Sequence, residues 1–289
     1  MLGADDPATM SPVEVRRYGA AAPGAPKVLF LHGLAGNDTM WQRAGDVLAG
    51  RQELWFAQLP WRGQGLAGWG HDPDLGRWVE QALLAVPGGP DAVVAHSMSS
   101  NVLLELLDRE QRAGRDPFAL HGIRALVLTA PFYRGRHDAF DWPAISYYLN
   151  DFHLILREGI HAQSRGRIAP ETEVAMAERV REWIGPAGWI RFFDLYLRTP
   201  DLRTDRITAP CLVLAGAADF AAPPDNATAI AAALPDARLR ILTGSGHFPM
   251  VDETELFGAE LQTFFDAVLE PRETLTTGSR PAGPVRTET

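Results

Sequence analysis

Short apolar runs bounded by glycine and proline alternate along this chain with longer segments in which apolar residues recur at helical spacing. Runs such as Val28-Leu29-Phe30-Leu31 contain no polar residue, as expected for strands that helices cover on both faces. The pattern predicts an α/β fold with a doubly wound, mostly parallel sheet. The expected strands are Val13–Tyr18, Lys27–His32, Leu54–Leu59, Ala92–His96, Ala125–Thr129, Cys211–Ala215 and Leu239–Leu242. The expected helices between them are Met40–Ala49, Leu75–Val86, Met98–Arg112, Asn226–Leu234 and Thr254–Leu269.

The alternation stops between about Arg134 and Arg206, where Ala144–Arg157 and Glu171–Ile184 indicate helices instead. With Phe132 and Tyr133 included, this stretch holds 12 of the 26 aromatic residues. Most of these rings are expected to form the insertion's own core, and a few to line an apolar cleft above the sheet. We therefore expect a core at residues 1–133 and 207–269, a helical insertion at 134–206, and a disordered tail at 270–289.

Composition narrows the possible partners. The 36 acidic and 27 basic residues give a net charge of −9, which argues against nucleic-acid binding. The single cysteine, Cys211, allows no internal disulfide. The N-terminal residues lack the features of a signal peptide, and no apolar run reaches the length of a membrane span, so we expect a cytoplasmic protein without membrane association. The single lysine, against 26 arginines, is typical of a GC-rich bacterial coding sequence.

A serine stands at the sharpest turn predicted in the chain. In Ala95-His96-Ser97-Met98-Ser99, a buried strand runs directly into a helix. Such a turn strains the serine backbone and lifts the hydroxyl above the sheet, and it tolerates only small residues two positions before and after. Ala95 and Ser99 meet this need, although the G-x-S-x-G pattern has glycine at both places. By itself, a serine that opens a helix is more often an N-cap.

An acid and a histidine follow Ser97 in chain order, each just beyond a late strand. Asp219 comes after the strand Cys211–Ala215, and His247 after Leu239–Leu242. Loops that follow parallel strands converge at the carboxyl edge of the sheet, where Ser97 also lies. His247 would accept the Ser97 proton, and Asp219 would orient the imidazole. A loop aspartate is commonly a turn residue and such a histidine can bind a backbone carbonyl, but these alternatives explain the ordered set of three poorly.

The remaining site predictions concern the substrate. The glycine-rich turn His32-Gly33-Leu34 can aim a backbone N–H at a reacting carbonyl oxygen, so we assign the oxyanion hole to the amides of Leu34 and Met98. The other histidines show no metal-ligand spacing and the glycines near Arg62 form no dinucleotide motif, so we expect neither metal nor other cofactor. We expect a small-molecule partner, and the sequence leaves the oligomeric state open. The residues we place at the substrate pocket are Trp61, Trp142, Tyr147 and Phe248.

These motifs together resemble the α/β-hydrolase superfamily, of the type with a helical cap inserted after the sixth strand. The resemblance runs from Val13 to Leu269, and its cap would be 134–206. The matching stretches are His32-Gly33-Leu34, Arg62-Gly63-Gln64-Gly65, the Ser97 turn, Gly216-Ala217-Ala218-Asp219 and Gly246-His247-Phe248-Pro249. Both glycines of the serine turn are missing, and Pro60-Trp61 stand where the family usually has an aspartate. A serine at the turn disfavours the epoxide-hydrolase and dehalogenase branches, which use a carboxylate.

Three functions are consistent with these features. The first is a serine hydrolase that cleaves an ester or thioester of a medium-sized, fairly apolar substrate through an acyl-enzyme on Ser97. The second uses the same triad as an acyltransferase or cyclase, or cleaves a carbon–carbon bond, in bacterial secondary metabolism. The third is a non-hydrolytic, ligand-binding protein on the same scaffold, which the missing turn glycines suggest. Replacing Ser97 separates the third function from the first two, and product analysis separates the second from the first.

Overall fold

A computed structural model describes residues 13–62, 66–151, 153–164 and 166–269. It contains a seven-stranded sheet in the order β1-β3-β2-β4-β5-β6-β7. β1 runs antiparallel to β3, and every other neighbouring pair is parallel. The predicted doubly wound, mostly parallel sheet is therefore confirmed. The strands are β1 Glu14–Tyr18, β2 Lys27–Leu31, β3 Glu53–Gln58, β4 Ala92–His96, β5 Ala125–Thr129, β6 Cys211–Gly216 and β7 Ala237–Leu242.

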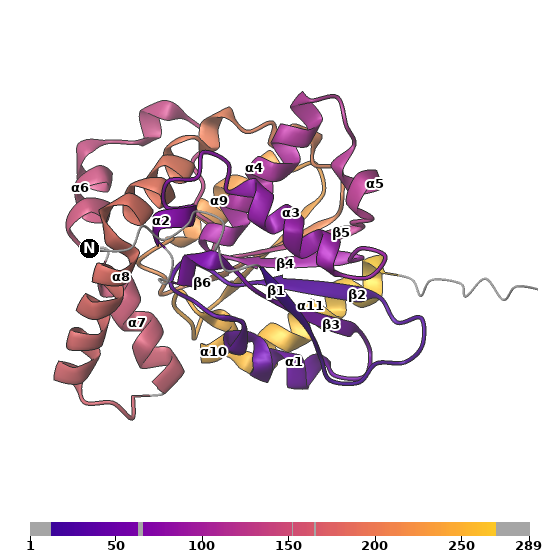
Figure 1. Cartoon of the computed structure of the whole chain (residues 1–289), viewed down its shortest axis with the longest axis horizontal. Coiled ribbons are helices and arrows are strands. Elements are labelled where there is room, and N and C mark those ends of the chain that lie inside the picture. Colours follow the sequence, from indigo (N-terminus) through magenta and orange to yellow (C-terminus); the bar gives the residue numbers. More distant parts are fainter. Residues whose placement is uncertain (1–12, 63–65, 152, 165, 270–289) are drawn as a thin grey trace, which may run out of the picture.

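Helices cover both faces of the sheet (Figure 1). One face packs against α3 (Gly76–Ala85), α4 (Met98–Arg112) and α9 (Pro224–Ala233). The other face packs against α1 (Gln42–Leu48) and α11 (Thr254–Val268). Shorter elements connect these layers: η1 Asp38–Trp41, η2 Pro60–Arg62, α2 Leu66–Trp69, α5 Pro117–His121, η3 His137–Ala139, η4 Thr199–Asp201, η5 Thr204–Arg206 and α10 Pro249–Asp252.

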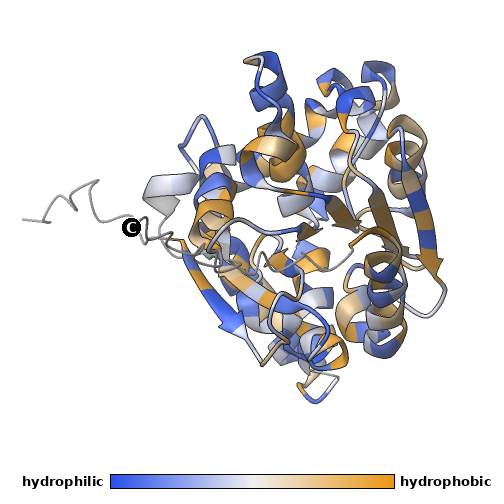
Figure 2. Cartoon of the chain, turned by 90° about the vertical axis from the view of Figure 1, so that its right-hand side faces the viewer, coloured by the Kyte–Doolittle hydropathy of each residue, from blue (hydrophilic) through white to orange (hydrophobic). Residues whose placement is uncertain are grey.

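Alternating side chains of each strand build two separate cores. In β2, Leu29 and Leu31 join the cluster under α3 and α4, whereas Val28 and Phe30 join the cluster under α1 and α11. Successive strand residues point to opposite faces, so a strand covered on both sides must be apolar throughout. Figure 2 shows the central strands as the most hydrophobic part of the ribbon, with hydrophilic residues on the outer helices.

The stretch between β5 and β6 forms a separate group of helices at the left of Figure 1, which we call the cap. Its helices are α6 (Trp142–Asn150), α7 (His153–Ser164) and α8 (Pro170–Leu197). The resemblance placed the cap after the sixth strand, whereas in this seven-stranded sheet it follows β5, the fifth strand of the chain, and precedes β6. The expected tail at 270–289 lies outside the described residues.

Two helix predictions within the cap were wrong in their boundaries. Residues 144–157 do not form one helix, because α6 ends at Asn150 and α7 begins at His153. The helix predicted to end at Ile184 continues to Leu197 as α8, with a kink at Gly185 (φ 61°, ψ 172°) directly before Pro186. Proline disfavours helical backbone at the preceding residue, and glycine tolerates the positive φ that results here. Hydrophobic periodicity alone therefore did not locate the ends of these helices.

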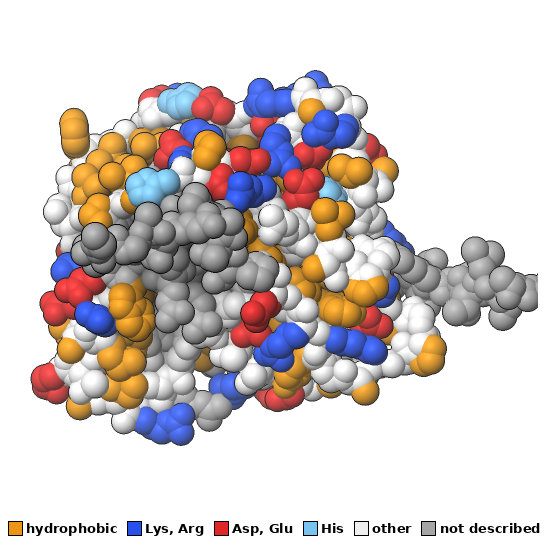
Figure 3. Space-filling model, in the orientation of Figure 1, with side chains coloured by type: hydrophobic (Ala, Val, Ile, Leu, Met, Phe, Trp, Pro, Cys, Tyr) orange, Lys and Arg blue, Asp and Glu red, His pale blue; other side chains and the backbone are white. Residues whose placement is uncertain are grey.

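Aromatic rings join the cap to the sheet. Phe132, which follows β5, packs edge-on against Phe192 of α8, with ring centroids 4.8 Å apart. Tyr196 lies 5.2 Å from Tyr148 of α6 and 5.0 Å from Phe140, again between ring centroids. On the outside, the cap leaves large hydrophobic side chains in solvent, and such side chains gather at the left of Figure 3. Within the described ranges, no helix has both the length and the apolarity needed to cross a bilayer.

Candidate active site

Ser97 occupies the sharp turn between β4 and α4. Its backbone has φ 54° and ψ −127°, in the left-handed half of the map that non-glycine residues rarely adopt. The side chain makes no capping hydrogen bond to α4, although Ser97 holds the N-cap position. The neighbouring small residues are buried, and Ser99 Oγ donates a hydrogen bond to the carbonyl of His32. The turn therefore presents the hydroxyl rather than using it to start the helix.

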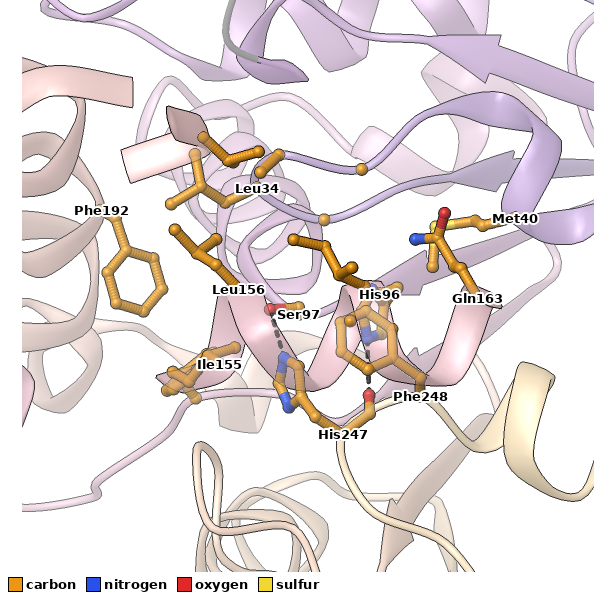
Figure 4. Close-up of a pocket in the computed structure, with 17 residues that line it drawn as sticks. Leu34, Met40, His96, Ser97, Ile155, Leu156, Gln163, Phe192, His247 and Phe248 are labelled. Carbon is orange, nitrogen blue, oxygen red and sulfur yellow. Dashed lines mark hydrogen bonds between the residues drawn. The ribbon is translucent and has the colours of Figure 1, made fainter. Parts of the chain in front are cut away.

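The structure brings the three predicted side chains together at the carboxyl edge of the sheet. Ser97 Oγ lies 2.9 Å from His247 Nε2, and His247 Nδ1 lies 2.8 Å from Asp219 Oδ2 (Figure 4 shows the first of these contacts). Because a carboxylate only accepts hydrogen bonds, Nδ1 carries the proton and Nε2 is free to accept one from Ser97. This arrangement can remove the serine proton during attack on a carbonyl carbon.

Asp219 is fixed from both sides. Its Oδ1 accepts hydrogen bonds from the backbone N–H groups of Ala221 at 2.9 Å and Ala222 at 2.8 Å, which leaves Oδ2 for His247. All three members of the constellation are buried, with Asp219 at 3% and His247 at 1% exposure. Low exposure strengthens the interaction between Asp219 and the imidazole, since water screens it little.

The histidines at the site differ in their proton affinity. Burial lowers the pKa of His247, but the charge of Asp219 and its hydrogen bond outweigh this and raise the pKa above its ordinary value. Burial and the nearby His247 hold the pKa of His96 well below its usual range, so His96 stays neutral. Its Nε2 donates to the backbone carbonyl of His247 at 2.9 Å. His96 therefore supports the position of His247.

Gly33 lets the loop after β2 lie directly over Ser97. A Cβ on Gly33 would come within 2.9 Å of both His96 Nδ1 and Ser97 Cβ, so a larger residue would displace the loop. His32 shapes the same turn, because its Nδ1 donates to the Gly33 carbonyl at 2.8 Å and its Nε2 accepts from Leu59 N at 2.9 Å. The next residue, Leu34, lines the same cavity as Ser97.

The two amides assigned to the oxyanion hole have no partner among the described residues. The N–H of Met98 is the first of helix α4, and the N–H of Leu34 lies in the loop over Ser97. By contrast, the next amide, Ala35 N, donates to Trp61 O at 2.8 Å. Free N–H groups beside a nucleophile can bind the negative oxygen of a tetrahedral intermediate.

A small cavity of about 70 Å³ lies above Ser97, between the sheet edge and the cap (Figure 4). Its walls are mostly apolar, and α7 contributes the largest share of the cap side. The lining residues are Gly33, Leu34, Ala35, Gly36, Met40, His96, Ser97, Phe132, Ile155, Leu156, Gly159, Ile160, Gln163, Val180, Phe192, His247 and Phe248. This volume holds a few water molecules, whereas ligand pockets are typically about 300–1,000 Å³. The described conformation is therefore closed.

Of the four predicted pocket residues, Phe248 lines this cavity. Trp61 does not, because it is fully buried in the core with its Nε1 bonded to the His32 carbonyl at 3.1 Å. Trp142 does not either, because it lies at the start of α6 and is 78% exposed. Tyr147 is in α6, but its side chain lies outside the described residues. The structure thus places neither tryptophan at this cavity, because aromatic composition says nothing about which way a ring faces.

Sequence reasoning missed the contribution of α7. Ile155, Leu156 and Gly159 face the cavity, and Glu158 contacts the loop that holds His247. The available signal was the apolar spacing of Ile155, Gly159 and Ile160 on one helical face. Among the described residues, no group of three or more histidine, cysteine, aspartate or glutamate side chains is arranged to hold a metal ion.

Comparison with known proteins identifies a family and one curated relative. A model of the alpha/beta hydrolase family matches residues 28–260. The pimeloyl-[acyl-carrier protein] methyl ester esterase of Vibrio atlanticus (strain LGP32) is 24% identical over 258 residues, covering 83% of this chain and 94% of that protein.

Two solved structures are similar to this fold. An esterase from Exiguobacterium antarcticum matches with a TM-score of 0.62 and 19% identity, over 88% of this chain and 95% of its own. A meta-cleavage product hydrolase from Pseudomonas fluorescens IP01 matches with a TM-score of 0.62 and 13% identity, over 88% and 94%. At such low identity these two structures bear on the fold alone. The family model spans most of the sheet and all of the cap, and the chain belongs to the alpha/beta hydrolase family.

Proposed function

We propose that this protein is a serine hydrolase that cleaves an ester or thioester of an apolar acyl group through an acyl-enzyme on Ser97. The observation that carries the proposal is the continuous hydrogen-bonded chain from Ser97 Oγ through His247 to Asp219. The ester-cleaving activity named for the Vibrio atlanticus relative supports the same reaction class. The chemistry of these residues uses no cofactor.

The proposed reaction has two halves. Ser97 Oγ attacks the substrate carbonyl carbon while His247 Nε2 takes the hydroxyl proton, and the amides of Leu34 and Met98 stabilise the oxyanion. His247 then gives this proton to the departing alkoxide or thiolate, which leaves an acyl group on Ser97. In the second half, water attacks the acyl carbonyl after losing a proton to His247, which returns it to Ser97 as the acid leaves.

The cavity walls support an apolar acyl group. Ile155, Leu156 and Phe192 from the cap face Phe132 and Phe248 from the core. Because the closed cavity is only about 70 Å³, a medium-sized acyl chain requires the cap side chains to move apart. We expect a screen of p-nitrophenyl esters to show a preference that changes when Leu156 is shortened to alanine.

Labelling with a fluorophosphonate tests the nucleophile directly. We expect one label per chain, on Ser97, and no label in Ser97→Ala. The same variant should lose roughly 10⁴- to 10⁶-fold in kcat/KM, because the acyl-enzyme cannot form. Ser99→Ala provides a matched control in the same turn, since its hydroxyl bonds to the His32 carbonyl and not to His247. A folded wild-type protein that takes up no label would support a non-hydrolytic, ligand-binding role instead.

Isotope incorporation then identifies the acyl acceptor. In water enriched in oxygen-18, hydrolysis places one labelled oxygen in the acid product. An unlabelled acyl product would favour transfer to another nucleophile or cyclisation. Cleavage of a carbon–carbon bond would appear as an acid and a carbon-protonated fragment in place of an alcohol or thiol.

A further inference from the structure

The cap reaches the loop that holds the proposed base. Glu158 of α7 accepts a hydrogen bond through Oε1 from the backbone N–H of His247, at 3.0 Å and across 89 residues of chain. On the same helix, Ile155 and Leu156 line the cavity beside Ser97 (Figure 4). One helix of the cap therefore both closes the cavity and contacts His247.

The loop is built to admit this carboxylate. A Cβ on Gly246 would lie 2.0 Å from Glu158 Oε1, so only glycine leaves room for the contact. The second oxygen, Glu158 Oε2, is buried and has no partner among the described residues, so the carboxylate is held there through Oε1 and the His247 N–H.

Two further carboxylates hold the same loop, and both come from nearby in the chain. Gly246 N donates to Asp252 Oδ2 at 3.0 Å, and Gly244 N donates to Glu253 Oε2 at 3.1 Å. Neither of these two contacts involves the cap. Of these three carboxylate contacts, the bond from His247 to Glu158 is the one whose acceptor comes from a cap helix.

The cap also contacts the loop of the proposed acid. Tyr148 of α6 donates through its hydroxyl to the carbonyl of Ala221 at 2.9 Å. Ala221 N in turn donates to Asp219 Oδ1 at 2.9 Å. Cap helices therefore contact both the loop of Asp219 and the loop of His247. Of these two contacts, the one to the His247 loop is made by an ionisable side chain, Glu158.

The charge of Glu158 acts on the imidazole. Burial raises the pKa of Glu158, while the His247 N–H opposes this by favouring the ionised form. The titratable groups that act most strongly on Glu158 are His247, Asp219 and Asp252. In its ionised form Glu158 adds to Asp219 in raising the pKa of His247.

We propose that Glu158 is a positioning residue for His247: its carboxylate fixes the His247 backbone when α7 is seated on the core, so that the base is fully placed only in the closed molecule. The catalytic consequence rests on the proposed function. The effect of Glu158 on the position of His247 does not rest on the proposed function, and it can be measured without turnover.

Three variants test the proposal. Glu158→Gln keeps an oxygen acceptor and removes the charge, whereas Glu158→Ala removes both. Glu173→Gln is the matched control, because Glu173 Oε1 bonds His161 Nδ1 at 2.8 Å inside the cap and does not contact His247. The readouts are kcat and KM, the pH dependence of kcat/KM, and the NMR titration of the His247 ring in carbon-13-labelled protein.

We expect Glu158→Ala to lower kcat by roughly 10- to 100-fold with KM nearly unchanged, because the base is misplaced but the cavity walls remain. We expect Glu158→Gln to keep most of kcat and to lower the His247 titration midpoint by about 0.5–1 pH unit. Glu173→Gln should change neither. If Glu158→Ala is poorly folded, the nearly isosteric Glu158→Gln still decides the question through the titration.

Wild-type kcat in folded Glu158→Ala, or a His247 titration in Glu158→Gln that matches Glu173→Gln, would overturn the proposal. Fluorophosphonate labelling of the wild type is run alongside. If the wild type is not labelled, the proposed hydrolase function fails. The His247 titration, which needs no substrate, then still shows whether Glu158 acts on the histidine.

Discussion

Backbone conformation decides what Ser97 can do at the level of the single residue. In the extended conformation of an ordinary N-cap, its hydroxyl oxygen would accept a hydrogen bond from the backbone N–H of Ser99 or Ser100 in the first turn of α4. At φ 54° the hydroxyl instead points to His247. The strain of this conformation, about 1–3 kcal/mol, is offset by the surrounding contacts that fix the turn. Ser97 N donates to the Thr129 carbonyl at 2.8 Å, which holds the turn to β5.

For the proposed hydrolase, we expect the acid limb of the pH profile of kcat/KM to report His247. The proposed mechanism uses the neutral imidazole, and the charge of Asp219 raises the pKa of this group against the effect of burial, so kcat/KM should fall as the pH drops through a midpoint above the ordinary histidine value. Asp219→Asn removes the main charge that raises this pKa, so the midpoint should move to lower pH. The rate should also fall by about 10⁴-fold, because the imidazole tautomer is no longer fixed.

Profiles of kcat/KM against pH for the wild type and Asp219→Asn measure both effects. Asp252→Asn serves as the comparison, since Asp252 bonds Gly246 N and not the imidazole. Its midpoint should shift less than that of Asp219→Asn. An unchanged midpoint in Asp219→Asn would show that His247 is not the group that titrates.

At the level of elements, the backbone at the end of β6 packs directly against the backbone of the loop after β7. A Cβ on Gly216 would lie 2.1 Å from the carbonyl oxygen of Gly246 and 2.3 Å from that of Ser245. Ala217 N donates to the Leu242 carbonyl at 2.8 Å, and Ala218 N donates to the Ser245 carbonyl at 3.0 Å. Asp219 and His247 are therefore held on two segments that cannot slide apart without losing these bonds.

We expect Gly216→Ala to push the His247 loop away from β6. Backbone atoms cannot yield as a side-chain tip can, so the variant should lose about 1–3 kcal/mol of unfolding free energy and at least 10²-fold in kcat/KM. Gly135→Ala is the matched control, because among the described residues a Cβ there meets only the Tyr133 side chain, at 3.7 Å or more. It should stay within about 0.5 kcal/mol of the wild type in urea unfolding. Equal stability of the two variants would contradict this account.

At the level of the whole molecule, a buried asparagine joins the core to the cap. Asn226 of α9 accepts through Oδ1 from Tyr133 N at 2.9 Å and from the Tyr196 hydroxyl at 3.0 Å. Tyr196 lies near the end of α8, and its hydroxyl also accepts from Arg134 Nε at 2.8 Å. Asn226 and Tyr196 are almost fully buried, so the junction where the cap leaves and rejoins the sheet depends on satisfied polar groups.

Removing this acceptor should loosen the junction. We expect Asn226→Ala to lower the free energy of unfolding by about 2–3 kcal/mol, since two buried donors lose their partner. Urea unfolding followed by circular dichroism measures the loss. Thr228→Ala in the same helix removes a hydroxyl that bonds Pro224 O at an exposed site, and should change stability by less than about 0.5 kcal/mol. A similar loss in both variants would assign the effect to α9 itself and not to the junction.

The sequence by itself determined the sheet and the chain order of the serine, aspartate and histidine at its carboxyl edge. Continuous apolar runs are required by strands covered on both faces, and the small residues around Ser97 are required by its turn. Asp219 and His247 could be placed because loops after parallel strands meet at one edge of the sheet. These features are local, or follow from chain order alone.

Only the tertiary structure decided which side chains of the cap face the site. Trp142 points into solvent and Trp61 into the core, although both are large apolar rings that we had placed at the substrate pocket. Glu158 reaches the His247 backbone across 89 residues, and its charged, unremarkable position in α7 gives no local sign of this. The face that a helix buries depends on what packs against it, and that free energy is gained only when segments far apart in the chain meet.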